Sequence, residues 1–96
     1  MSHHDIRKAA EKGISQGLAE LGIQYSLGQG VPQNYEEAYF WLDVALAGKL
    51  SSRWQHLAAK IRDDAASHLT KNELTQTQER AEKWFAAHPP TGGTFS

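Results

Sequence analysis

The sequence contains no cysteine and almost no excess of charge of either sign. Without cysteine the chain can form no disulfide bond, no thiolate nucleophile and no cysteine-ligated zinc site. Ten Lys and Arg residues stand against eleven Asp and Glu residues, so the formal net charge is -1. Proteins that bind a phosphate backbone rely on an excess of basic side chains. Nucleic acid is therefore not an expected partner.

Long apolar runs are missing as well. No segment approaches the roughly 20 apolar residues that a membrane-spanning helix needs. The polar start, Met1–Asp5, is not followed by an apolar run of signal-peptide length. We therefore expect a soluble, cytoplasmic protein that does not bind membranes, with the periplasm as the alternative if a signal peptide has been removed. The 96 residues suffice for one domain with a modest core.

Apolar residues recur at helical spacing, and no segment alternates at strand spacing. This pattern predicts a single all-α domain over residues 1–90, with about five helices. The first helix covers residues 4–12 and ends at Gly13, and the second covers residues 15–27. Gly17 and Gly22 lie inside the second helix, where each costs about 1 kcal/mol relative to alanine. We expect the close approach of a neighbouring helix to offset that cost.

Three further helices are indicated by capping signals. They begin at residues whose side chains can cap a helix N-terminus: Asn34, Ser51 or Ser52, and Thr70. Asn34 and Thr70 are followed three residues later by Glu37 and Glu73, the spacing of a capping box. The last helix ends before Pro89. The apolar stripes expected to face the core are Ala38, Trp41, Leu42, Ala45 and Leu46; then Trp54, Leu57, Ala58, Ile61 and Ala65; then Leu74, Ala81, Trp84 and Phe85.

An ordered series of small, aromatic and apolar residues lies within residues 13–49. It consists of Leu21, Gly22, Tyr25, Gly28, Gly30, Val31, Tyr35, Ala38, Trp41 and Ala45. The series resembles the Sel-one-like repeat, a relative of the tetratricopeptide repeat. Gly22 and Ala38 are small enough for two antiparallel helices to approach closely, and Tyr25 and Trp41 would fill the space beside them. The two glycines of the turn permit backbone angles that are closed to other residues.

The resemblance implies a right-handed α-α superhelix, a solenoid of antiparallel helical hairpins. Residues 4–13 would then be half a repeat, residues 13–49 a full repeat and residues 50–88 a capping hairpin. Residues 91–96 would form a disordered tail. Such arrays usually need about three repeats to bury a continuous core. A second copy of the chain would therefore be one way to cover the N-terminal end.

The resemblance also implies a function in binding other proteins. In helical-hairpin solenoids the first helix of each pair lines the inner curve. The residues of that helix expected to face outward, toward a partner, are Gln16, Glu20, Ile23, Gln24 and Leu27. We expect a non-enzymatic adaptor or scaffold that binds a peptide or a helix on this face. One alternative is a self-assembling homodimer joined through its N-terminal end, with no separate peptide ligand; another is an ordinary solvent-exposed face.

No combination of residues indicates catalysis, a cofactor or a strong metal site. His3 and His4 could hold a metal weakly, but adjacent histidines at a polar chain start are more simply solvated. The other histidines do not form the one-turn pair that places two ligands on one helix face. Asp63 and Asp64 are consecutive and point in different directions, so they are a poor acid–base pair. We therefore expect no enzyme activity, no cofactor and no metal.

Overall fold

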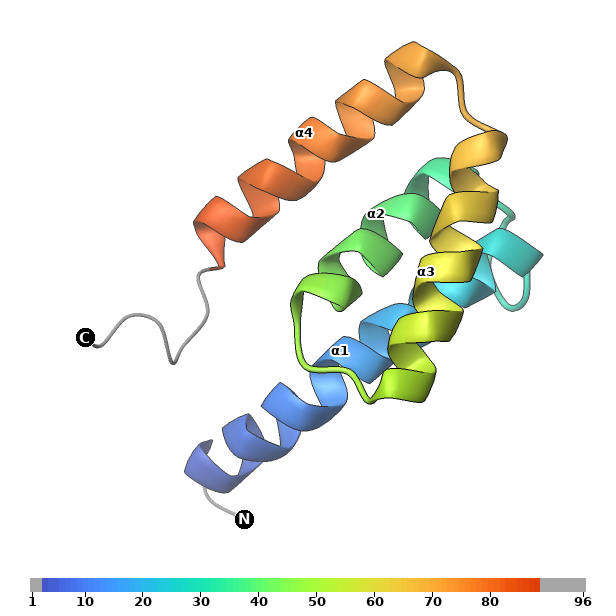
Figure 1. Ribbon diagram of the computed structural model, residues 1–96. Coiled ribbons are helices and arrows are strands. Elements are labelled where there is room, and N and C mark those ends of the chain that lie inside the picture. Colours follow the sequence, from blue (N-terminus) through green and yellow to red (C-terminus); the bar gives the residue numbers. More distant parts are fainter. Residues whose placement is uncertain (1–2, 89–96) are drawn as a thin grey trace.

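The computed structural model describes the backbone of residues 3–88 and the side chains of residues 14–88. Four helices make up this part of the chain: α1 (His3–Leu27), α2 (Tyr35–Ala47), α3 (Ser52–Ser67) and α4 (Lys71–Ala87). No strand occurs among the described residues, which confirms the all-α prediction. The helix α2 lies centrally and contacts each of the other three helices (Figure 1).

The prediction of a separate first helix is wrong. The helix α1 continues without a break from His3 to Leu27, through Gly13. The described part of the chain therefore has four helices, whereas the sequence pattern predicted about five. A glycine inside a helix costs only about 1 kcal/mol, and no proline follows Gly13 to prevent the helix from continuing.

The predicted helix starts at the caps are confirmed. The side-chain oxygens of Asn34, Ser51 and Thr70 accept hydrogen bonds from backbone N–H groups three residues later, at 3.1, 3.4 and 3.1 Å. Glu73 completes the capping box of α4, because its carboxylate accepts a hydrogen bond from the backbone N–H of Thr70 at 2.8 Å. These bonds satisfy N–H groups that have no partner inside the helix.

The turn between α1 and α2 requires its two glycines. Gly28 and Gly30 have φ values of 72° and 75°, in the left-handed region that other residues rarely adopt. This path brings the N–H of Gly28 to within 2.7 Å of the carbonyl oxygen of Gln24 and the N–H of Asn34 to within 2.9 Å of that of Tyr25. The last carbonyl groups of α1 are thus satisfied by the turn that follows it.

Small residues form the face of α1 that packs on α2. This face consists of Ser15, Ala19, Gly22 and Ser26, all of them buried. A Cβ atom at Gly22 would lie 2.6 Å from Cγ of Leu42 and 3.1 Å from the carbonyl oxygen of Ala38. The predicted close approach is therefore confirmed at Gly22. It is wrong at Gly17, which is exposed and would have no neighbour within 4 Å of an added Cβ atom.

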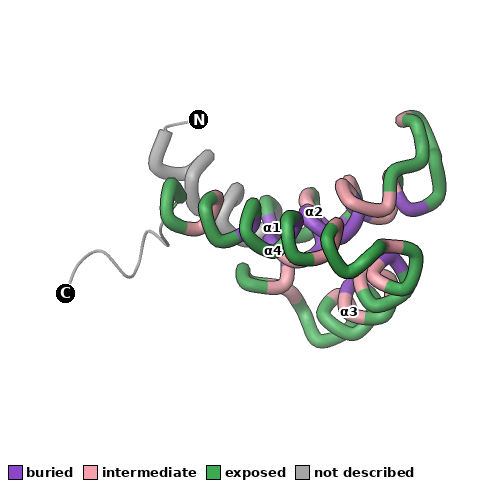
Figure 2. Tube along the Cα trace, turned by 90° about the horizontal axis from the view of Figure 1, so that it is seen from above, coloured by how far each residue is buried: buried purple, intermediate pink, exposed green. Residues whose placement is uncertain are grey.

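The helix α2 is buried on several sides because its neighbours surround it (Figure 2). Its buried residues are Ala38, Tyr39, Phe40, Leu42, Val44 and Ala45. Leu42 and Ala45 join Ala19 of α1 and Ala58 of α3 in one core cluster. The predicted stripe omitted Tyr39, Phe40 and Val44, since the search for a single apolar face does not anticipate a helix that packs on three neighbours.

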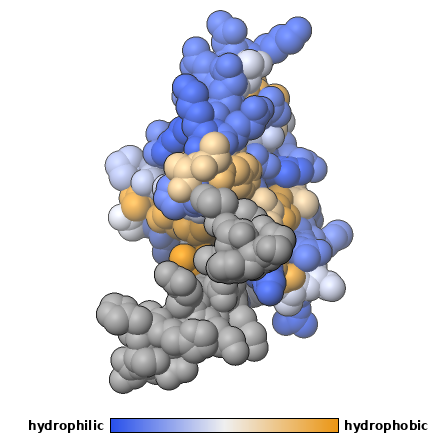
Figure 3. All heavy atoms as spheres, turned by 90° about the vertical axis from the view of Figure 1, so that its left-hand side faces the viewer, coloured by the Kyte–Doolittle hydropathy of each residue, from blue (hydrophilic) through white to orange (hydrophobic). Residues whose placement is uncertain are grey.

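The helix α4 lies against α2 and diverges from α3 (Figure 1). Phe40 and Val44 of α2 pack with Ala81 of α4, and Trp84 and Phe85 pack beside them. Figure 3 shows apolar surface on the side of the molecule where α4 ends. The described residues thus form a compact arrangement of four helices, in which no stack of antiparallel hairpins is identified.

Polar contacts also attach α3 and α4 to α2. Arg80 donates hydrogen bonds to both carboxylate oxygens of Glu37, at 2.6 and 3.4 Å, and its guanidinium lies 3.8 Å from the ring centroid of Phe40. On the other side, Arg62 of α3 donates to the carboxylate of Asp43 at 3.1 Å. Both helices are thereby held to α2 by charge as well as by apolar contact.

Candidate functional site: a groove between α1 and α3

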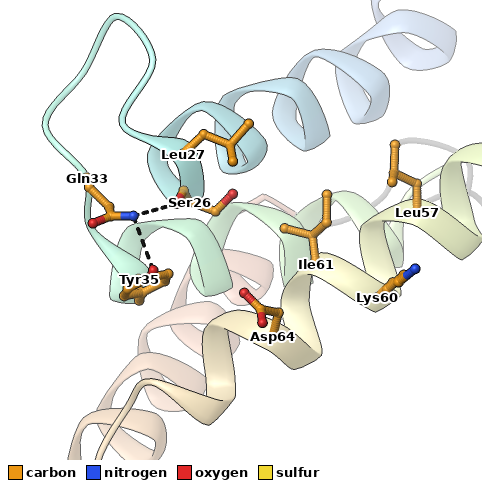
Figure 4. A pocket seen from close by; sticks show the side chains of 8 residues that line it. All are labelled: Ser26, Leu27, Gln33, Tyr35, Leu57, Lys60, Ile61 and Asp64. Atoms are coloured by element: carbon orange, nitrogen blue, oxygen red, sulfur yellow. Dashed lines mark hydrogen bonds between the residues drawn. The ribbon is translucent and has the colours of Figure 1, made fainter.

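A shallow, open groove of about 480 Å³ lies between the C-terminal part of α1 and the outer face of α3. It is lined by Ser26, Leu27, Gln33, Tyr35, Leu57, Lys60, Ile61 and Asp64, and these residues define the α1–α3 groove (Figure 4). Three helices and the turn after α1 contribute to it, since Tyr35 is the first residue of α2. The site therefore exists only in the folded chain.

Two leucines give the groove an apolar surface that faces solvent. Leu27 of α1 is 59% exposed and Leu57 of α3 is 39% exposed. Ile61 lies between them in the groove wall and packs against the core cluster of α1, α2 and α3 (Figure 4). The prediction that α3 turns a stripe to the core is confirmed at Ala58 and Ala65, which are fully buried, and is wrong at Leu57, which is exposed. Burying a leucine contributes about 1.5–3 kcal/mol, so both side chains would gain from a partner.

The end of the groove next to the turn is polar and held by hydrogen bonds. Nε2 of Gln33 donates to the carbonyl oxygen of Ser26 at 2.9 Å and to the hydroxyl of Tyr35 at 3.1 Å. The ring of His68 stacks on that of Tyr35, with centroids 4.0 Å apart and an interplanar angle of 7°. These contacts tie the turn to α1 and α2, and they tie the start of α2 to the end of α3, so this end of the groove is preformed.

Opposite charges stand one helical turn apart on the α3 wall. Lys60 and Asp64 both line the groove. Asp64 lies 3.9 Å from Nε2 of His68, which is an ion pair only when the imidazole is protonated. Lys60 forms no ion pair with any of the residues whose side chains are described. The wall therefore offers both a positive and a negative group to a molecule in the groove.

Of the partner-facing residues expected from sequence, only Leu27 lines the groove. Gln16, Glu20 and Gln24 are exposed on α1 but lie outside it. Ile23 was expected to face outward, and this is wrong: it is partly buried against the core cluster around Ala19 and Leu42.

The α3 half of the groove is not among the partner-facing residues expected from the sequence. Leu57 and Ile61 are one helical turn apart and belonged to the apolar stripe expected to face the core. Nothing local, however, indicated that this stripe would stand beside the end of α1.

The repeat-like positions lie mostly at the contact of α1 with α2 and in the turn between them. Gly22, Ala38 and Ala45 are buried, and Gly28 and Gly30 make the left-handed turn. The larger members of the series are partly buried, namely Leu21, Tyr25, Val31 and Trp41. Tyr25 packs against the cluster that contains Ala38, whereas Trp41 packs against the cluster that joins α2 to α4.

Among the described side chains, no three His, Asp or Glu residues are grouped so that they could hold a metal ion. The weak candidates His3 and His4 lie outside the described side chains. None of the described helices combines the length and the apolar character needed to cross a membrane.

Comparisons with protein-family models, with curated proteins and with solved structures find nothing that matches this chain. The function is therefore inferred from the geometry of the α1–α3 groove.

Proposed function

We propose that this chain is a non-enzymatic protein–protein interaction module, an adaptor or scaffold, that binds a helix or peptide of a partner protein in the α1–α3 groove. The observation that carries the proposal is the pair of exposed leucines, Leu27 and Leu57, which come from different helices and line one groove. Solvent-exposed apolar side chains gathered in a concave site are typical of binding surfaces.

A helix suits this groove better than an extended strand. The walls are formed by helices, whose backbone groups bond within each helix, and the last carbonyl groups of α1 already accept from the turn. An extended peptide would therefore find few backbone partners for its own N–H and C=O groups. A helix satisfies these groups internally and presents apolar side chains one turn apart, which is the spacing of helix-in-groove recognition.

We also propose that residues 13–49 are a Sel-one-like repeat within a right-handed α-α superhelix. Two observations support this assignment: the close packing of Gly22 on Ala38 and Leu42, and the left-handed glycines of the turn. In this proposal α3 and α4 close the repeat. Protein binding is then the function that the resemblance implies.

Selection from a library of displayed peptides tests the binding proposal. The native chain, immobilised at low density, should enrich peptides with leucine or isoleucine at helical spacing. Leu57→Asp and Leu27→Asp should each weaken binding of an enriched peptide at least about tenfold, since a tenfold change corresponds to about 1.4 kcal/mol, less than one buried leucine contributes. The matched control is Ile14→Asp, because Ile14 is 56% exposed on α1 but lies outside the groove.

The same binding assay can refute the proposal. If both groove variants bind every enriched peptide as tightly as the native chain does, the groove is not the binding site. Circular dichroism checks that all three variants keep the native helix content.

A further inference from the structure

We infer that the α1–α3 groove binds α3 of a second copy of this chain, so that two copies pair across a two-fold axis. This inference rests on the proposed function, because it names the helix that occupies the same groove. Three features of the described residues carry it: the order of charges on α3, the register that this order imposes, and the exposed leucines at the two ends of the groove.

The charges of α3 are complementary to themselves. Lys60 and Asp64 are four residues apart and lie on the same face of the helix. In an isologous contact each surface meets its own copy, so residue i faces residue j and residue j faces residue i. Two antiparallel α3 helices can therefore place Lys60 of each copy against Asp64 of the other, forming two identical ion pairs. Lys60, which forms no ion pair with the described residues of its own chain, would gain a partner.

This register also places the exposed leucines favourably. When Lys60 faces Asp64, Leu57, three residues before Lys60, faces Ser67, three residues after Asp64. Ser67 precedes His68, whose ring stacks on Tyr35 at the polar end of the groove, next to the turn. Leu27 lies at that end too, whereas Leu57 lies at the opposite end (Figure 4). Each copy would therefore insert Leu57 beside Leu27 of the other, and both exposed leucines would become buried.

The charge order favours a second copy over a helix from another protein. A helix from another protein could carry whatever charges complement Lys60 and Asp64. Binding such a helix would not require α3 to be complementary to itself. Self-pairing requires opposite charges at positions related by the two-fold axis, and α3 has them on the wall of its own groove. The same two-fold axis would also bring the apolar Leu57 at one end of the groove to the apolar Leu27 at the other end.

Charge exchange on full-length chains tests the inference, with the molar mass measured by light scattering coupled to size-exclusion chromatography over a range of concentrations. The native chain should pass from one to two chains in mass as its concentration rises. Lys60→Glu and Asp64→Lys should each raise the dissociation constant at least about tenfold, because two attractive contacts become repulsive. The control Lys83→Glu makes the same charge change on the exposed surface of α4, outside the groove, and should leave the mass unchanged.

The decisive sample is an equimolar mixture of the Lys60→Glu and Asp64→Lys chains. Each variant alone has like charges across the axis, whereas the mixed pair has two attractive contacts, so the mixture should associate at concentrations where neither variant does. The double variant Lys60→Glu/Asp64→Lys should likewise recover self-association. Circular dichroism on each variant checks that the helices are retained.

Three results would overturn the inference: a native chain that stays monomeric at millimolar concentration, a dimer that neither charge variant weakens, or a mixture that does not associate. None of these results contradicts the proposed function. That function is refuted only if the Leu27 and Leu57 variants bind peptides as tightly as the native chain does. If the native chain is monomeric and Leu57→Asp abolishes peptide binding, the self-pairing is refuted and the proposal of an interaction module is supported.

Discussion

The two glycines inside α1 should respond to the same substitution in opposite ways. Gly17 is exposed, and a Cβ atom added there meets no heavy atom within 4 Å. Gly17→Ala should therefore raise the free energy of unfolding by about 1 kcal/mol, the difference in helix propensity between the two residues. The predicted gain comes from the backbone alone, because the new methyl group faces solvent.

Gly22→Ala makes the same gain in propensity but adds a methyl group to a full contact. The added Cβ atom would lie 2.6 Å from Cγ of Leu42, whereas carbon atoms in van der Waals contact are about 3.5–4.0 Å apart. Leu42 is completely buried and therefore cannot swing into solvent. Overpacking of this kind costs about 1–3 kcal/mol. The net effect should be a loss of about 0–2 kcal/mol, and Gly22→Ala should lie about 1–3 kcal/mol below Gly17→Ala.

Urea unfolding followed by circular dichroism measures both effects, and thermal unfolding provides a second reading, in which 1 kcal/mol corresponds to about 4–8 °C in Tm. A further variant tests the cause. In a Leu42→Ala background the contacts with the Leu42 side chain are removed and the contact with the carbonyl oxygen of Ala38, at 3.1 Å, remains. Gly22→Ala should therefore cost less there than in the native background, although Leu42→Ala itself costs about 2–5 kcal/mol. Equal stabilisation by alanine at both glycines in the native background would refute the close approach of α1 and α2 at Gly22.

Three further substitutions test how the other elements are held. Gly28→Ala should lower the free energy of unfolding by about 1–2 kcal/mol, because Gly28 has a φ of 72° and a Cβ atom disfavours that conformation. Thr70→Ala should cost about 1 kcal/mol through loss of the N-cap of α4. Arg80→Ala should cost about 1 kcal/mol at low salt, since it removes the ion pair with Glu37 and the contact with an aromatic ring, and the loss should shrink at high salt. Urea unfolding measures all three.

Matched controls separate these causes from general damage. Gly28→Asn should cost less than Gly28→Ala, because asparagine tolerates the left-handed region better. Thr70→Ser should retain most of the cap. Lys83→Ala removes a positive charge from the same helix as Arg80→Ala and should change stability by less than about 0.5 kcal/mol. An Arg80→Ala effect that is no larger than the Lys83→Ala effect would show that the Glu37 pair contributes nothing measurable.

The caps and the turn could be predicted because their causes lie within a few residues of one another. Asn34 and Thr70 each bond a backbone group three residues later, and the glycines at 28 and 30 set their own backbone angles. Gly13 shows the limit of such signals. A glycine can end a helix or lie inside one. Its cost inside a helix is only about 1 kcal/mol, so the residue alone does not determine where the helix ends.

The packing of the helices could not be predicted in the same way. Gly17 and Gly22 are both glycines inside a predicted helix, and the sequence does not distinguish them. They differ because Leu42 of α2 lies against Gly22. Leu57 belongs to an apolar stripe, yet α3 turns the neighbouring Ala58 inward and leaves Leu57 exposed. The α1–α3 groove depends on this orientation of α3. It combines α3 residues with Leu27, which lies far from them along the chain.

The sequence by itself therefore determined the all-α class, the caps of α2, α3 and α4, and the glycine turn, since each depends on contacts between near neighbours in the chain. Tertiary structure decided the burial of α2 on several sides, the placement of α4 on α2 and the existence of the groove. These depend on which helix faces meet, and that outcome is set by the packing of many side chains at once, in which any single apolar residue has several possible partners.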